Sequence, residues 1–206
     1  MINYLQILWG EIMRRLWITG YRSYELGVFK DDDPKIKVIK NLLKRELSER
    51  LNQSEDEFWL ISGPQMGVER WAIEVGNTLK KDYPQLKTAI MEPYLNVAQR
   101  WNEQNQEKLV AALSAVDFHA AVSDHPYQSP QQLRNYQDFM LNHSDGLLLV
   151  FDVDREEESE QTSKPVWDYR AAKKYQEHSD YQLQTISFAE LQEIATEMAE
   201  EEHPDY

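Results

Sequence analysis

The sequence predicts an α/β fold, a single three-layer α/β/α domain built on a mainly parallel sheet. Short apolar segments rich in branched and aromatic residues alternate with longer segments whose apolar residues recur at helical spacing. No internal repeat or low-complexity linker divides the 206 residues, a length at which one domain buries a substantial core. Such alternation is typical of a parallel sheet covered by helices on both faces.

Six short segments have the composition of strands. The segment at 146–151 is continuously apolar, so we expect it in the centre of the sheet. The segment at 58–62 is followed by Gly63 and Pro64, which break the strand. The predicted strands are residues 15–19, 58–62, 86–91, 118–123, 146–151 and 183–186.

Helices are predicted between these strands, each with an apolar face that repeats every three or four residues. Several starts carry capping residues, such as Asp33 before Pro34 and the pairs Ser129 with Gln132 and Ser187 with Glu190. The predicted helices are residues 33–52, 66–79, about 105–116, 129–140, 164–178 and a last, acidic helix from 187 onward.

The composition excludes several function classes. The net charge is −14, and residues 175–206 contain nine acidic residues and no Lys or Arg, so we predict no nucleic-acid partner. No apolar run approaches the roughly 18 residues of a membrane span, so we predict no membrane partner. The chain has no cysteine, which excludes disulfides and fits a cytoplasmic location. The five histidines show no metal-binding spacing, and we predict neither a metal nor a cofactor.

Residues 1–12 do not fit the domain pattern. They are largely apolar, but they have no basic start and are interrupted by Gly10 and Glu11, which does not match a signal peptide. We expect them to form an N-terminal extension outside a domain of residues 13–206, with Met13 as a candidate internal translation start.

The chain is organised around the strand, turn and helix at 58–72. This arrangement aims backbone N–H groups at a bound anion, and Gly63 and Gly67 would let a phosphate or ribose approach the backbone closely. Ser62 and Gln65 belong to the same turn. Glu69, in the first helical turn, favours a ribose diol or an amine over a phosphate. The alternative is a tight turn with Glu69 as a solvated acid.

Loops after the other strands open on the same edge of a parallel sheet, where ligands bind near the point at which strand order reverses. Gly20 and Arg22 follow the first strand, with Arg22 as an anion partner. Arg100 and Trp101 follow the third strand and could pair with a phosphate and stack on a base. His125 follows the fourth. Alternatively, Arg22 caps a helix, Trp101 anchors the core and His125 is structural.

Three motifs together resemble the YpsA family of Firmicutes: TGYRSYELG at 19–27, ISGPQMGVE at 61–69 and SDGLLL at 144–149. The resemblance covers about residues 13–194. That family belongs to the SLOG superfamily of Rossmann-like proteins, which also holds the DNA-processing protein DprA and the LOG phosphoribohydrolases. Residues 61–72 are similar to the strand, loop and helix of DprA.

The resemblance implies a Rossmann-like fold and a nucleotide-derived ligand, ADP-ribose or a relative, bound by Gly63, Gly67 and Glu69. It also implies a link to the regulation of bacterial cell division. LOG enzymes carry a glycine-rich Pro-Gly-Gly-x-Gly-Thr motif and a catalytic Glu after the strand that matches 146–151. Residues 152–158 here are DVDREEE, acidic and without glycine, so the resemblance does not extend to LOG activity.

Three hypotheses follow for the function. In the first, the domain senses a small nucleotide-like ligand and relays its binding to a protein partner. In the second, it cleaves an N-glycosidic bond, with Glu69 as nucleophile or base and His125 or Arg22 assisting. In the third, it is a ligand-free scaffold that uses its acidic last helix or its Trp-rich surface as a partner site. No residue is assigned as catalytic, and self-association stays open.

Overall fold

The computed structural model describes residues 14–158 and 162–202, and the predicted extension at 1–12 lies outside them. Six strands form one parallel sheet in the order β4-β3-β2-β1-β5-β6, which confirms the predicted fold class. The strands are β1 (Arg15–Gly20), β2 (Phe58–Ser62), β3 (Leu86–Glu92), β4 (Phe118–Ala121), β5 (Gly146–Val150) and β6 (Gln182–Ile186).

The helices connect successive strands as the sequence predicts. They are α1 (Pro34–Leu51), α2 (Val68–Leu79), α3 (Glu103–Ala115), α4 (Pro130–Asn142), α5 (Val153–Glu158), α6 (Pro165–Gln176) and α7 (Phe188–Glu202), with a 3-10 helix, η2, at Ser23–Leu26. The predicted capping residue Asp33 accepts a hydrogen bond from the backbone N–H of Lys35 at 2.9 Å, which fixes the start of α1.

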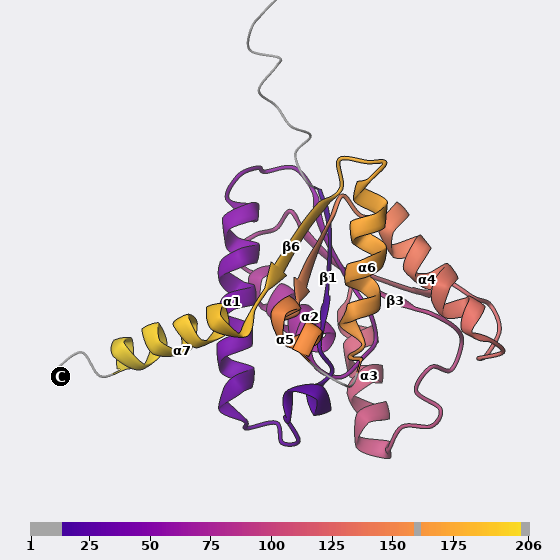
Figure 1. Cartoon of the computed structure of the whole chain (residues 1–206), viewed down its shortest axis with the longest axis horizontal. Helices are drawn as coiled ribbons and strands as arrows, with labels where there is room; N and C mark the ends of the chain where they lie inside the picture. Colours follow the sequence, from indigo (N-terminus) through magenta and orange to yellow (C-terminus); the bar gives the residue numbers. More distant parts are fainter. Residues whose placement is uncertain (1–13, 159–161, 203–206) are drawn as a thin grey trace, which may run out of the picture.

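The helices lie in two layers around the sheet (Figure 1). Helices α1, α2 and α7 cover one face, with α3 beside α2, while α4 and α6 pack together on the other face. Trp17 of β1 is fully buried between the layers, as are Leu43 of α1 and Leu148 of β5. Helix α7 contacts α1 near its start and then extends away from the body of the domain.

The strand order reverses at β1, which lies between β2 and β5. Strand β5 is buried at every position, in agreement with its continuous apolar sequence. The loops after β1, β2 and β5 therefore meet at one end of the sheet. This end is the place where open α/β sheets bind their ligands.

Two short elements were not predicted, η2 and α5. Residues 153–158 are mostly acidic and have no apolar periodicity that would indicate a helix. Strand β4 ends at Ala121 instead of the predicted residue 123. It lies at the edge of the sheet, and its pairing with β3 ends where Ala121 meets Glu92.

Candidate functional site

The turn before α2 contacts the loop after β1 through backbone atoms. Gly67 forms an antiparallel bridge with Arg22, the N–H of Ser23 donates to the Met66 carbonyl at 3.0 Å, and the N–H of Val68 donates to the Tyr21 carbonyl at 3.2 Å. Gly67 has φ 120°, and a Cβ there would lie 2.6 Å from backbone atoms of both Ser23 and Tyr21. Only glycine fits this crossing of two loops.

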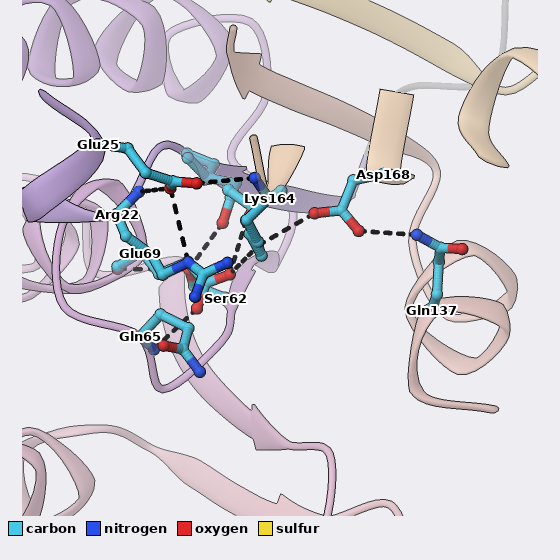
Figure 2. A network of polar contacts seen from close by, with 10 residues as sticks. Arg22, Glu25, Ser62, Gln65, Glu69, Gln137, Lys164 and Asp168 are labelled. Carbon is cyan, nitrogen blue, oxygen red and sulfur yellow. Dashed lines mark hydrogen bonds and ion pairs between the residues drawn. The ribbon is translucent and has the colours of Figure 1, made fainter. Parts of the chain in front are cut away.

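Glu69 is the centre of a buried polar network (Figure 2). Its side chain is nearly inaccessible, with the residue 2% exposed. Oε1 accepts hydrogen bonds from Thr19 Oγ1 and Lys164 Nζ, each at 2.6 Å, and Oε2 accepts one from the backbone N–H of Gln65 at 2.8 Å. The amine predicted to pair with Glu69 is thus supplied by Lys164 of the same chain. The alternative prediction, that Glu69 is a solvated acid, is wrong because the residue is buried.

Lys164 joins two carboxylates that come from different helices. Its ammonium lies 2.6 Å from Glu69 Oε1 and 3.0 Å from Asp168 Oδ2, and the other oxygen of Asp168 accepts from Gln137 Nε2 at 2.9 Å. Burial alone would raise the pKa of Glu69, but the Lys164 charge and the hydrogen bonds from Lys164, Thr19 and Gln65 lower it overall. The two carboxylates likewise raise the pKa of Lys164 against the effect of burial.

Gly63 lies directly beside this network. A Cβ at this position would be 2.3 Å from Glu69 Oε2 and 2.8 Å from Tyr136 Oη. The Tyr136 hydroxyl is buried and has no hydrogen-bond partner among the described residues. Burial and the charges of Glu69 and Asp168 raise its pKa well above 10, so the hydroxyl keeps its proton. The glycine at 63 therefore makes room for the Glu69 carboxylate.

Glu69→Gln is expected to lower the free energy of unfolding by only about 1–3 kcal/mol at pH 7, because the pair with Lys164 is lost but Lys164 keeps Asp168 as its buried partner. The folded-state pKa of Glu69 lies below its ordinary value of 4.5. The stabilisation that ionised Glu69 contributes is therefore fully present above about pH 4.5, and it is lost as the pH falls through the folded-state pKa. Urea unfolding at pH 7 and pH 3 should show a difference between wild type and variant that shrinks in acid. An equal difference at both pH values would contradict this assignment.

The remaining predicted residues of the first two loops have structural contacts. Gly20 packs against β5, where a Cβ would lie 2.7 Å from the Val150 carbonyl oxygen. Ser62 is buried and its hydroxyl donates to the Ile18 carbonyl at 2.7 Å. Arg22 lies over the ring of Tyr24, and its Nε is 3.5 Å from Glu25 Oε2. The backbone N–H of Lys164 donates to the other oxygen of Glu25 at 2.8 Å, which connects Arg22 to the network.

Arg100, Trp101 and His125 lie outside the network. Arg100 is exposed and Trp101 is half-buried on the loop that leads into α3, where the Trp101 carbonyl accepts from Gln106 Nε2 at 2.9 Å. The His125 ring is exposed and lies 2.5 Å from Asp124 Oδ1. No described hydrogen bond or ion pair links these three side chains to Glu69 or Lys164.

A cleft of about 570 Å³ opens beside Gly67 at the same end of the sheet. The cleft is lined by the loop after β1, by the first half of α1, by the first two turns of α2 and by the start of α3. Four cationic side chains line it, against two carboxylates: Lys30, Lys40, Arg70 and Lys108 against Asp31 and Glu74. The cleft therefore carries an excess of positive charge in a chain whose net charge is −14.

The carboxylates hold three of these cations in place. Glu74 binds Lys40 through one oxygen and Arg70 through the other, each at 2.6 Å, and Asp31 binds Lys108 at 2.6 Å. Lys30 makes no ion pair with any residue that the structure describes. Two aromatic rings on the same wall are exposed, Phe29 at 81% and Tyr24 at 55%. Such a cleft can bind phosphate through its cations and stack a base on its aromatic rings.

No sequence pattern indicated that Lys164, Asp168 and the four cations of the cleft belong to the site. Lys164 is 95 residues from Glu69, and no local pattern connects them. One indication was available. Lys164 is the first residue of the predicted helix 164–178, which follows the apolar strand at 146–151, and the start of such a helix lies near the edge of the sheet where ligands bind. The spacing of Arg70 and Glu74, four residues apart on one helix, indicates an ion pair but not a cleft.

The parallel sheet, its reversal at β1 and the polar loops at its carboxyl edge define a Rossmann-like domain of the class associated with nucleotide-related binding. None of the described helices is both long and apolar enough to cross a membrane, and no described group of His, Asp or Glu could hold a metal ion. Residues 16–191 match the YpsA family model, described as the YspA SLOG family, and the chain belongs to this family.

Curated relatives are similar over nearly their whole length. A UPF0398 protein of Limosilactobacillus reuteri is 53% identical over 188 residues, which cover 91% of this chain and 96% of the relative. UPF0398 proteins of Pediococcus pentosaceus and Lactiplantibacillus plantarum are 50% and 49% identical, over 88% and 93% of this chain and 94% and 97% of the relatives. The resemblance to the YpsA family is thereby confirmed.

Proposed function

We propose that the chain binds a nucleotide-derived ligand with a pyrophosphate group, ADP-ribose or a relative, in the cleft beside Gly67. The observation that carries the proposal is the excess of cations in this cleft, at the carboxyl edge of a strongly acidic chain. Its volume of about 570 Å³ lies within the usual range for small-molecule sites. Membership of a SLOG family supports the same class of ligand.

In this proposal Arg70, Lys30 and Lys108 face the phosphates, and Phe29 or Tyr24 stacks on the base. Gly67 lines the cleft, while Ser62, Gly63, Gln65 and Glu69 support the Gly67 turn from behind.

Arg100 and Trp101 directly precede Asn102, which lines the cleft, so they stand next to a ligand that extends beyond the start of α3. Gly20 and Arg22 hold the loop after β1 that forms the opposite wall. His125 lies on the loop after β4, and its backbone carbonyl accepts a hydrogen bond from the Leu95 N–H. In this proposal it holds the loop after β4 against the loop after β3 at the same edge of the sheet.

The proposal is binding without turnover. Both carboxylate oxygens of Glu69 accept hydrogen bonds from the protein, so Glu69 is not placed to attack an N-glycosidic bond. We extend the proposal to a cytoplasmic sensor whose bound state is recognised by a protein partner in the control of cell division, the role that the family resemblance implies.

ADP-ribose at about one hundred times its dissociation constant should stabilise the fold by roughly 2.7 kcal/mol, which raises Tm by about 5–10 °C for a domain of this size. Arg70→Gln and Lys30→Gln should remove most of this shift, because each takes a positive charge out of the cleft. Differential scanning fluorimetry measures the effect. Arg134→Gln, an exposed arginine of α4, is the matched control and should respond as wild type. A folded wild-type protein that shows no shift with ADP-ribose, NAD or AMP would overturn the proposal.

A further inference from the structure

A second groove continues the cleft along the surface. It has a volume of about 250 Å³, lies between α1 and α2, and shares Lys40 and Glu74 with the cleft. Its lining residues are Lys37, Lys40, Asn41, Lys44, Glu74, Val75, Thr78 and Leu79. The cleft and the groove thus form one trough that runs from Gly67 to Lys44.

Three lysines of α1 stand in line along this groove. Lys37, Lys40 and Lys44 are spaced three and four residues apart, so they share one face of the helix and span roughly 10 Å along its axis. Successive lysines of this row are therefore neighbours on the helix surface, with Cβ atoms about 5–6 Å apart. The acidic residues of α1 begin only after Lys44, at Glu46, which is paired with Arg50.

The whole trough carries a strong excess of positive charge. Six cationic side chains line it against two carboxylates, Asp31 and Glu74. A row of lysines on a helix is ordinarily a solvated face, but here Glu74 bridges Lys40 to Arg70 across the junction of the cleft and the groove. The Glu74 carboxylate thereby orients two cations of the trough, Lys40 in the groove and Arg70 in the cleft. The positive charges of the groove and the cleft are therefore continuous.

We propose that the groove binds additional phosphate groups, and that the ligand of this protein is a nucleoside polyphosphate. This inference rests on the proposed function, because the nucleoside and its first phosphates lie in the cleft. A linear phosphate chain carries one or more negative charges per group, and lysine ammonium groups bind phosphate as point charges. A ligand with only two phosphates would contact the cleft without reaching Lys37 and Lys44 of the groove.

The test compares ligands of increasing phosphate number by isothermal titration calorimetry at constant ionic strength. We expect the affinity to rise from AMP through ADP-ribose and ATP to adenosine tetraphosphate. The dissociation constant of adenosine tetraphosphate should be about tenfold lower than that of ADP-ribose, which corresponds to about 1.4 kcal/mol shared between the two added, solvent-exposed charge contacts. Inorganic tripolyphosphate should bind weakly and should compete with adenosine tetraphosphate.

The variant Lys37→Gln/Lys44→Gln distinguishes the contribution of the groove to the affinity from that of the cleft, because both lysines line the groove alone. It should lose most of the tenfold gain while its affinity for ADP-ribose stays within about twofold of wild type. The matched control is Lys173→Gln/Lys174→Gln, which removes the same charge from exposed positions of α6. The control should keep the full dependence on phosphate number.

The outcomes distinguish this inference from the proposed function. ADP-ribose binding with no gain for longer phosphate chains would overturn the inference and leave the proposed function intact. An equal loss in the groove and control variants would also overturn it, because the effect would then reflect net charge alone. Binding of tripolyphosphate at the groove without binding of any nucleotide would overturn the proposed function, and with it the assignment of a nucleoside polyphosphate.

Discussion

Lys164→Met is expected to lower the free energy of unfolding at pH 7 by about 3–5 kcal/mol, the usual effect of removing one member of a buried ion pair. The substitution leaves the carboxylates of Glu69 and Asp168 buried at one site without the ammonium that lies 2.6 and 3.0 Å from them. For a domain of this size the loss corresponds to a fall in Tm of roughly 10 °C. Thermal and urea unfolding measure both quantities.

The pH dependence identifies the cause. Without Lys164 the pKa of Glu69 rises, because burial is no longer opposed by the ammonium, so the folded variant takes up a proton as the pH falls. Its deficit relative to wild type should therefore shrink between pH 7 and pH 4. Lys173→Met, on the exposed side of the same helix, is the control and should change stability by less than about 0.5 kcal/mol. A Lys164→Met variant as stable as the control would show that the buried charges are compensated in another way.

Gly67→Ala is expected to destabilise the protein by about 2–6 kcal/mol and to abolish ligand binding in the fraction that folds. The backbone at 67 has φ 120°, which costs an L-residue about 1–3 kcal/mol. The new Cβ would also lie 2.6 Å from backbone atoms of Ser23 and Tyr21, and the shift needed to relieve this overlap costs about 1–3 kcal/mol more. The wall of the cleft would move with these atoms.

Gly27→Ala provides the matched control. Gly27 also has a positive φ, 65°, but a Cβ there would meet only Lys35 Nζ at 3.7 Å. Its cost should therefore be limited to the left-handed backbone, about 1–2 kcal/mol, with ligand binding retained. Chemical denaturation and ADP-ribose titration of both variants test the difference. Equal destabilisation by the two substitutions would show that the contact between the loops has no energetic consequence.

The elements set by local chemistry were predictable from the sequence. Strand β2 coincides with the predicted residues 58–62, because an apolar run of strand length ends there at a glycine and a proline. The start of α1 follows from Asp33 and Pro34, whose effects on the backbone are local. The alternation of these elements is also enough to indicate a parallel sheet and the edge at which its loops meet.

The candidate site depends on contacts that no local pattern contains. Gly63 was assigned to the approach of a ligand, whereas its hydrogen atoms make room for Glu69 and Tyr136 in the structure. Lys164 pairs with Glu69 only because β5 lies next to β1 and brings the start of α6 over the edge of the sheet. In the sequence, the lysines of α1 are typical of a solvated helix face. The groove that they line is formed only because α2 packs beside α1 in the structure.

The placement of β1 between β2 and β5 also affects how the chain can fold during its synthesis. Arg15 meets Asp145 across 130 positions, and Thr19 meets Lys164 across 145. A ribosome therefore releases the segments of β2, β3 and β4 while one side of β1 still has no neighbour, a state exposed to mispairing. The Glu69 loop gains its counter-charge only after residue 164 has emerged. A nascent chain that lacks the last quarter carries every motif of this loop without the ammonium of Lys164, so the buried ion pair forms only late in synthesis.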